Sequence, residues 1–191
     1  SANGLHYAWD WGGVHFVALN KFSGSGPDPG RPFNQRWNDP TGSLEFLAAD
    51  LRARAAGRPV ILLQHYGFDD FSAGWGWWSE KDRTATWDAI RDFNVVAYLH
   101  GHTHAMTFMK WRGEDIHGPG RSQPADGIDV IGCGAGQRGP DAPGEFMVFR
   151  VRKDEIAVAH RFVDRWGETR RIPIPPGARW PRTADPATPR P

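Results

Sequence analysis

The chain has 191 residues and a formal net charge of +1, so it is long enough to bury a substantial core, and its bulk charge favours neither nucleic acid nor an anionic membrane as a partner. No run of about 18 apolar residues occurs, so no transmembrane helix is expected. The single cysteine, Cys133, excludes an internal disulfide framework and a cysteine-based zinc site.

The chain opens with a predicted hairpin. Residues 5–11 and 14–20 are rich in aromatic and β-branched residues and flank Gly12-Gly13, a pair typical of a tight turn between two strands. Aromatic side chains alternate along the first strand and therefore share one face. We expect these side chains to pack in the core; they are Tyr7, Trp9 and Trp11.

A helix and a buried strand are predicted next. Residues 41–57 have an apolar stripe typical of a helix, which Thr41 or Ser43 is expected to cap and Gly57 to end. The run VILLQH then reads as a central strand that is apolar on both faces and ends at His65.

The middle of the chain repeats this order. Ser79 is expected to cap a second helix, with Asp82 as its capping-box partner. Asn94 ends that helix, and VVAYLH forms the next buried strand, which ends at His100. Strands that alternate with helices and are apolar throughout predict a layered α/β fold.

The last part of the chain predicts more strands and then a tail. MTFMKWRG and IDVIGCGAG read as strands, and two further alternating runs form a hairpin around Lys153-Asp154. Seven of the last twenty residues are proline, which is typical of an extended linker. We therefore expect one domain over residues 1–169 and a Pro-rich tail or linker over residues 170–191.

Histidines cluster where the predicted strands end. His102 and His104 are two positions apart, so in extended backbone they share a face and lie roughly 6.5–7 Å apart, which suits one ligand for each of two metals about 3.5–4 Å apart. Gly101 lets the backbone turn sharply beside them. His65 ends the neighbouring parallel strand, and ligands of α/β sheets collect at such carboxyl ends. The sequence therefore predicts a metal site there.

These residues resemble a known family. YLHGHTH, with LLQHY upstream and YAWDWGGVHFVALN before both, is similar to the C-terminal half of a calcineurin-like metallophosphoesterase. Gly101-His102-Thr103-His104 fills the GHxH motif of that family, and His65 takes the place of its single strand-end histidine. The resemblance covers roughly residues 5–163. It implies an α/β/β/α sandwich of which only the C-terminal portion is present.

The resemblance also implies the chemistry of the site. His65 and His102 would bind one metal ion and His104 the other, with Zn, Mn or Fe as the pair of divalent or trivalent ions. The expected activity is phosphatase or phosphodiesterase hydrolysis by a hydroxide that both metals activate. Ligation requires neutral imidazoles, so activity should fail in acid.

The upstream part of the family pattern is missing. Its D-x-H, G-D-x-x-D and G-N-H-(D/E) motifs supply the bridging aspartate, the other oxygen ligands and the acid/base histidine, and none occurs here. The chain is therefore expected to work with an N-terminal half of the same domain, from the same gene or a partner chain. The carboxylates with the wrong spacing or order are Asp10, Asp69, Asp70 and Asp82.

Two alternatives stay open. The chain is either a non-catalytic binding module that keeps the fold, or a mononuclear zinc hydrolase with His65, His102 and His104 as a three-histidine site. Two metals, one metal or none per complete particle would separate the three interpretations. The composition is compatible with a secreted or periplasmic bacterial enzyme.

Several other residues are candidates for substrate contact, each with an ordinary packing role as its alternative. A tryptophan-rich loop after His65 favours a phosphoester with a bulky organic group, which its rings would stack against. A Gly-rich turn that ends in an arginine suits an anion. These candidates are Asn20, Tyr66, Trp75, Trp77, Trp78, His100 and Arg138.

Overall fold

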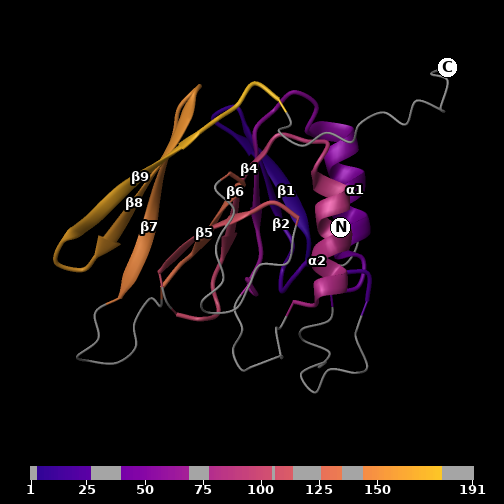
Figure 1. Ribbon diagram of the computed structural model, residues 1–191, viewed down its shortest axis with the longest axis horizontal. Helices are drawn as coiled ribbons and strands as arrows, with labels where there is room; N and C mark the ends of the chain where they lie inside the picture. The colour runs from indigo at the N-terminus through magenta and orange to yellow at the C-terminus, as the bar shows by residue number, and fades with distance from the viewer. Residues whose placement is uncertain are drawn as a thin grey trace.

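The computed structural model describes residues 4–26, 40–68, 78–104, 106–113, 126–134 and 144–177. Within them the chain is mixed α/β, with two helices and two sheets (Figure 1). The elements are β1 (Tyr7–Trp11), β2 (Val14–Ala18), α1 (Ser43–Arg54), β3 (Val60–Leu63), α2 (Glu80–Ile90), β4 (Val95–His100), β5 (Thr107–Trp111), β6 (Ile128–Gly132), β7 (Glu145–Val151), β8 (Glu155–Phe162) and β9 (Trp166–Pro173).

The larger sheet has six strands in the order β1-β2-β3-β4-β6-β5. The four inner strands are parallel to their neighbours, whereas β1 and β5 run antiparallel at the two edges. The inner strands are buried along almost their whole length, as their continuous apolar runs predicted. The α/β class expected from the sequence is therefore confirmed, and parallel pairing brings the carboxyl ends of β2, β3, β4 and β6 to one edge.

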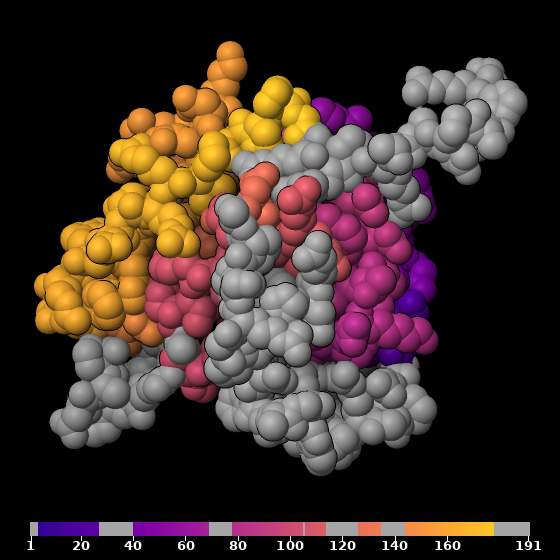
Figure 2. All heavy atoms as spheres, in the orientation of Figure 1, coloured from indigo at the N-terminus to yellow at the C-terminus, as the bar shows by residue number. Residues whose placement is uncertain are grey.

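Both described helices pack on one face of this sheet, and the three-stranded sheet β7-β8-β9 packs on the other (Figure 1). In the space-filling view, the atoms of β7–β9 and those of α2 lie on opposite sides of the molecule (Figure 2). The described residues thus form three layers. No helix among them is long and apolar enough to span a membrane.

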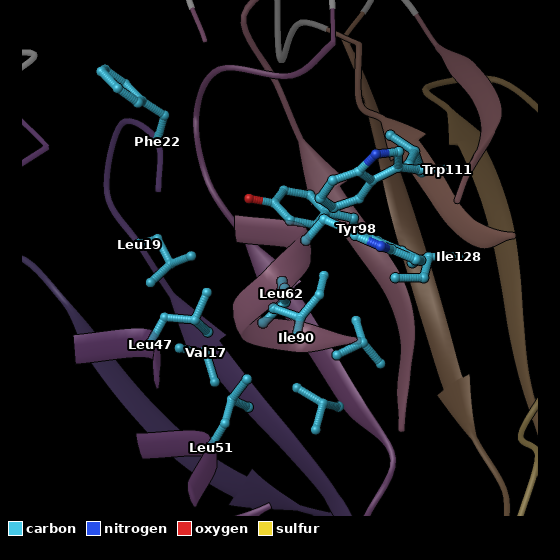
Figure 3. Packing of buried hydrophobic residues seen from close by; sticks show 14 of the residues in the cluster. Val17, Leu19, Phe22, Leu47, Leu51, Leu62, Ile90, Tyr98, Trp111 and Ile128 are labelled. Carbon is cyan, nitrogen blue, oxygen red and sulfur yellow. The ribbon is translucent and has the colours of Figure 1, made fainter. Parts of the chain in front are cut away.

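The helices are fixed by a few buried side chains and by their first turns. Leu47 and Leu51 of α1 are fully buried and lie beside Val17 of β2 (Figure 3). The expected cap of α2 is confirmed, because the Asp82 backbone N–H donates to Ser79 Oγ at 3.0 Å. The expected cap of α1 is wrong. Its N-cap is Gly42 in a left-handed conformation with no side-chain cap bond.

The expected tail begins later than the sequence suggested. β9 continues through Pro173, Ile172 is fully buried between the sheets, and the Ile174 backbone N–H donates to Asp154 O at 2.8 Å. Proline is compatible with this placement because β9 is an edge strand of the three-stranded sheet. The prediction failed because proline content was read as excluding any core element.

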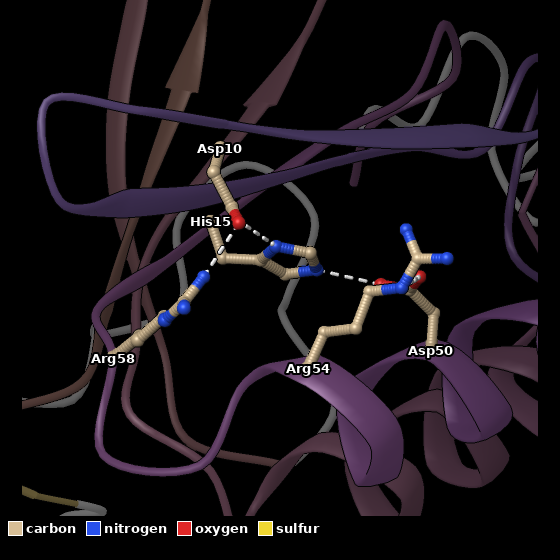
Figure 4. A network of polar contacts seen from close by, with 5 residues as sticks. All are labelled: Asp10, His15, Asp50, Arg54 and Arg58. Atoms are coloured by element: carbon tan, nitrogen blue, oxygen red, sulfur yellow. Dashed lines mark hydrogen bonds and ion pairs between the residues drawn. The ribbon is translucent and has the colours of Figure 1, made fainter.

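A polar network ties the first hairpin to α1 (Figure 4). His15 of β2 is buried, and its two ring nitrogens lie 2.7 Å from Asp10 Oδ1 and 2.6 Å from Asp50 Oδ2. Arg58 donates to the other Asp10 oxygen at 2.6 Å, and Arg54 lies 3.6 Å from Asp50. The network lies at the amino end of β2, so it holds the hairpin at the edge opposite the histidine cluster.

Candidate metal centre

The carboxyl ends of β2, β3 and β4 place three candidate residues side by side. The His65 backbone N–H donates to Asn20 O at 2.8 Å, and the Gly101 N–H donates to His65 O at 3.1 Å. These bonds continue the parallel ladder beyond the last strand residues. Asn20, His65 and His102 are thus held at one edge by backbone pairing.

The side chains of His65 and His102 face each other. His102 Nδ1 lies 3.3 Å from His65 Nε2, and the two ring centroids are 5.1 Å apart with planes at 71°. Two nitrogens that bind one tetrahedral zinc at about 2.0 Å each lie about 3.3 Å apart. The pair therefore has the separation of two ligands on one metal ion, which fits the assignment of both histidines to the same metal.

His104 does not join this pair. Its side chain is exposed, and within the described part of the chain no group of three or more histidine, cysteine, aspartate or glutamate side chains is arranged to hold a metal. This arrangement gives no support to the three-histidine alternative. It is compatible with His104 serving a second ion whose other ligands come from elsewhere.

Backbone strain is concentrated at the same edge. Among the described residues, three that are not glycine have φ in the left-handed region: Asn20 at 56°, His102 at 76° and His104 at 57°. Such conformations cost of order 1–3 kcal/mol each and occur preferentially at functional sites. All three are residues that the sequence singled out. The left-handed turns also explain why His102 and His104 do not follow the alternation assumed for extended backbone.

His100 is buried behind the histidine pair. Its side chain is 5% exposed, so it is not a surface contact for a substrate in this arrangement. A methyl group at Gly67 would overlap the His100 ring, and one at Gly132 would lie 2.9 Å from it. Two glycines thus make room for His100 beneath the site, a packing role that the sequence analysis named as its alternative.

Tyr66 is also buried and supports His102 edge-on. The two ring centroids are 4.7 Å apart with planes at 83°. Lys21 lies on the other side of Tyr66, with Nζ 6.0 Å from the ring centroid. Sequence reasoning missed Lys21, although a lysine directly after a strand-end asparagine was a signal for an anion contact.

Trp78 was expected to stack on a substrate, and the structure places it in the core instead. The ring is fully buried against Phe68 and Tyr98, and its indole N–H donates to Ser23 O at 2.7 Å. The satellite core that was its alternative is therefore the better account of Trp78. Trp75, Trp77 and Arg138 lie outside the described residues.

Cys133 lies at the end of β6, where its backbone N–H donates to His100 O at 2.8 Å. Its side chain is half-buried, and this burial, with a smaller contribution from the Glu145 charge, raises the pKa of the thiol. A raised pKa disfavours the thiolate, which is the nucleophilic and metal-binding form. The expectation that Cys133 is chemically inert is supported by this surrounding.

The described donor set of the centre is therefore one facing imidazole pair, an exposed third histidine, a strand-end asparagine and a nearby lysine. This set suits partial ligation of a transition metal and contact with an anion, but it contains no carboxylate ligand within the described residues. Neither a model of a known protein family nor a curated protein matches the chain.

Proposed function

We propose that the chain is the C-terminal part of a metal-dependent phosphoester hydrolase of the calcineurin-like metallophosphoesterase type, with an α/β/β/α sandwich when complete. The observation that carries this proposal is the 3.3 Å separation of the His65 and His102 ring nitrogens at the ends of adjacent parallel strands. The GHxH sequence supplies the type of site, and the geometry of this pair is what such a site requires.

In this proposal His65 and His102 hold one metal ion and His104 contributes to a second. When bound, such a pair of metals supplies a hydroxide at neutral pH and neutralises charge on phosphoryl oxygens. The chain fixes the two facing rings through backbone pairing at His65 and through the edge-on contact of Tyr66 with His102. Ring orientation is thus set before any metal arrives.

Two further side chains have roles in binding the phosphoester. Asn20 lies at the end of β2, where its left-handed backbone turns the chain away from the sheet beside His65. Lys21 follows it, and the Tyr66 N–H donates to Lys21 O at 2.8 Å. An amide and an ammonium group at this edge suit phosphoryl oxygens, which accept hydrogen bonds from both.

The oxygen ligands are proposed to come from a second polypeptide segment. Hard carboxylate ligands are expected in a two-metal hydrolase, and the described residues offer none beside His65. The N-terminal half of the same domain, from the same gene or a partner chain, would supply them. Its substrate is proposed to be a phosphoester with a bulky organic group.

Metal content and turnover test the proposal. The complete protein, purified in the presence of Zn²⁺ or Mn²⁺, should contain two metal ions and hydrolyse p-nitrophenyl phosphate or its bis ester. One metal would favour the mononuclear hydrolase, and none would favour a binding module. His15→Gln is the matched control, because this histidine lies at the opposite edge of the same sheet and should retain metal.

A further inference from the structure

An exposed aromatic row crosses the edge strand β1. Tyr7 is 57%, Trp9 39% and Trp11 59% exposed, and Leu5 at the start of the row is 47% exposed. The sequence analysis expected these rings in the core, and that expectation is wrong. Such a run of large apolar side chains on one strand face is rare on a protein that functions with this face open to water.

The row continues the packing between the two sheets. Trp9 stacks on Phe16 with centroids 5.0 Å apart and planes at 9°, and Phe16 is buried in the inter-sheet core. At the turn before β2, a methyl group on Gly12 would lie 3.8 Å from Val151 of β7. The three-stranded sheet therefore reaches the tip of the hairpin and leaves the rest of β1 uncovered.

The size of the row indicates what kind of occupant suits it. Three partly exposed aromatic rings and a leucine present on the order of 400–500 Å² of apolar surface. A stable interface between independent proteins usually buries about 800 Å² per partner. A segment joined to the chain needs less area, because the covalent link raises its effective concentration to about the millimolar range.

We infer that this row, Leu5, Tyr7, Trp9 and Trp11, is the docking surface of a polypeptide segment that is joined to the chain on its N-terminal side. The segment presents apolar side chains to the row and so extends the layer that β7–β9 begin. Leu5 is where such a segment would reach the row. This inference rests on the proposed function, because we identify the segment as the one that supplies the carboxylates.

The direction of β1 connects this surface to the metal centre. β1 is antiparallel to β2, and Tyr7 pairs with Ala18, two residues before Asn20. The Tyr7 end of the row is therefore the end nearest to His65, whereas Trp11 lies toward the opposite edge. A segment that covers Tyr7 thus emerges beside the site that lacks carboxylates among the described residues.

Hydroxyl-radical footprinting tests the inference with an internal control. Trp11 and Trp166 of β9 are matched in exposure, at 59% and 58%, but Trp166 is in the other sheet. In residues 1–191 alone the two rings should be oxidised at similar rates. In the longer protein that the gene encodes, oxidation of Tyr7 and Trp11 should fall at least fivefold, while that of Trp166 should stay unchanged.

Each other outcome overturns the inference. Unchanged oxidation of Tyr7 and Trp11 in the longer protein, or a gene that encodes nothing before Ser1, would contradict it. Protection that appears in residues 1–191 as the concentration rises, with a dimer in sedimentation, would assign the surface to a second copy instead. Metal content of the same samples separates the two proposals, because protection without metal would retain the docking surface and remove the proposed function.

Discussion

His65 and His102 are 37 residues apart in the chain and present ring nitrogens to each other at 3.3 Å. No helix or hairpin joins them directly. Their approach depends on the parallel pairing of β3 with β4, which places both residues just beyond the ends of neighbouring strands. This relationship makes the centre a property of the sheet, so changes that move either strand end should change metal affinity.

His102→Ala should remove metal and activity together. The variant leaves His65 without the facing nitrogen and deletes a ring that packs edge-on against Tyr66. We expect metal content of the complete protein to fall to background and kcat/KM to fall at least about a hundredfold, the upper range for loss of groups that only support a ligand. Metal analysis and phosphoester hydrolysis measure the two effects.

His15→Gln provides the comparison for His102→Ala. It removes a buried imidazole at the other edge of the sheet, so it reports the cost of losing a structural histidine. It should lower the stability of the protein without lowering metal stoichiometry at a temperature where it is folded. Full activity in His102→Ala would sink the metal assignment.

Gly67→Ala should disturb the centre more than Gly101→Ala does. A methyl group at position 67 overlaps the His100 ring, which is confined by the end of β6. We expect a loss of about 1–3 kcal/mol in the free energy of unfolding, the usual cost of overpacking. Because Gly67 follows His65 and Tyr66 in the chain, metal affinity should fall as well.

Gly101→Ala is the matched control. Its methyl group would lie 3.8 Å from His65 Nδ1, an ordinary contact distance, and Gly101 is not in the left-handed region. Chemical denaturation and metal titration of both variants test the contrast. Equal stability of the two variants would show that the loop after His65 yields without cost.

The sequence predicted the metal centre better than the surroundings of that centre. His65, His102 and the α/β order followed from apolar runs that end in histidine, because buried parallel strands constrain both pattern and position. The burial of His100, Tyr66 and Trp78 did not follow, because the loops between strands decide which rings water reaches. Ring type alone does not encode that choice.

The aromatic residues of β1 illustrate the same limit from the opposite side. Alternation placed Tyr7 and Trp9 on one face correctly, but it did not show whether a second layer covers that face. The tail boundary failed for a related reason. Ile172 is buried by β8 and the larger sheet, although it lies in a proline-rich segment.

Asn20→Ala should be more harmful than Asn20→Gly. Asn20 has φ of 56°, a conformation that asparagine and glycine tolerate and that costs alanine about 1 kcal/mol or more. The free energy of unfolding should therefore fall in the alanine variant and change little in the glycine variant. If Asn20 also contacts the phosphoester, both variants should raise KM. Denaturation curves and steady-state kinetics separate the two effects.

Asp10→Asn should lower stability near neutral pH and have little effect in acid. Hydrogen bonds from His15 and then from Arg58 hold the pKa of Asp10 below its ordinary value. A carboxyl with a depressed folded-state pKa stabilises the protein fully above its ordinary pKa, about 4, and loses that contribution as the pH falls through the lower folded value.

The measurement is the difference in unfolding free energy between wild type and Asp10→Asn across this range. The difference should be constant from about pH 7 to about pH 5 and shrink below about pH 4. Asp164→Asn, at an exposed aspartate of the other sheet, controls for removal of a surface charge. A difference that stays the same in acid would mean that Asp10 holds the hairpin by packing, because a network of charges at the amino end of β2 must weaken when its exposed carboxylate is protonated.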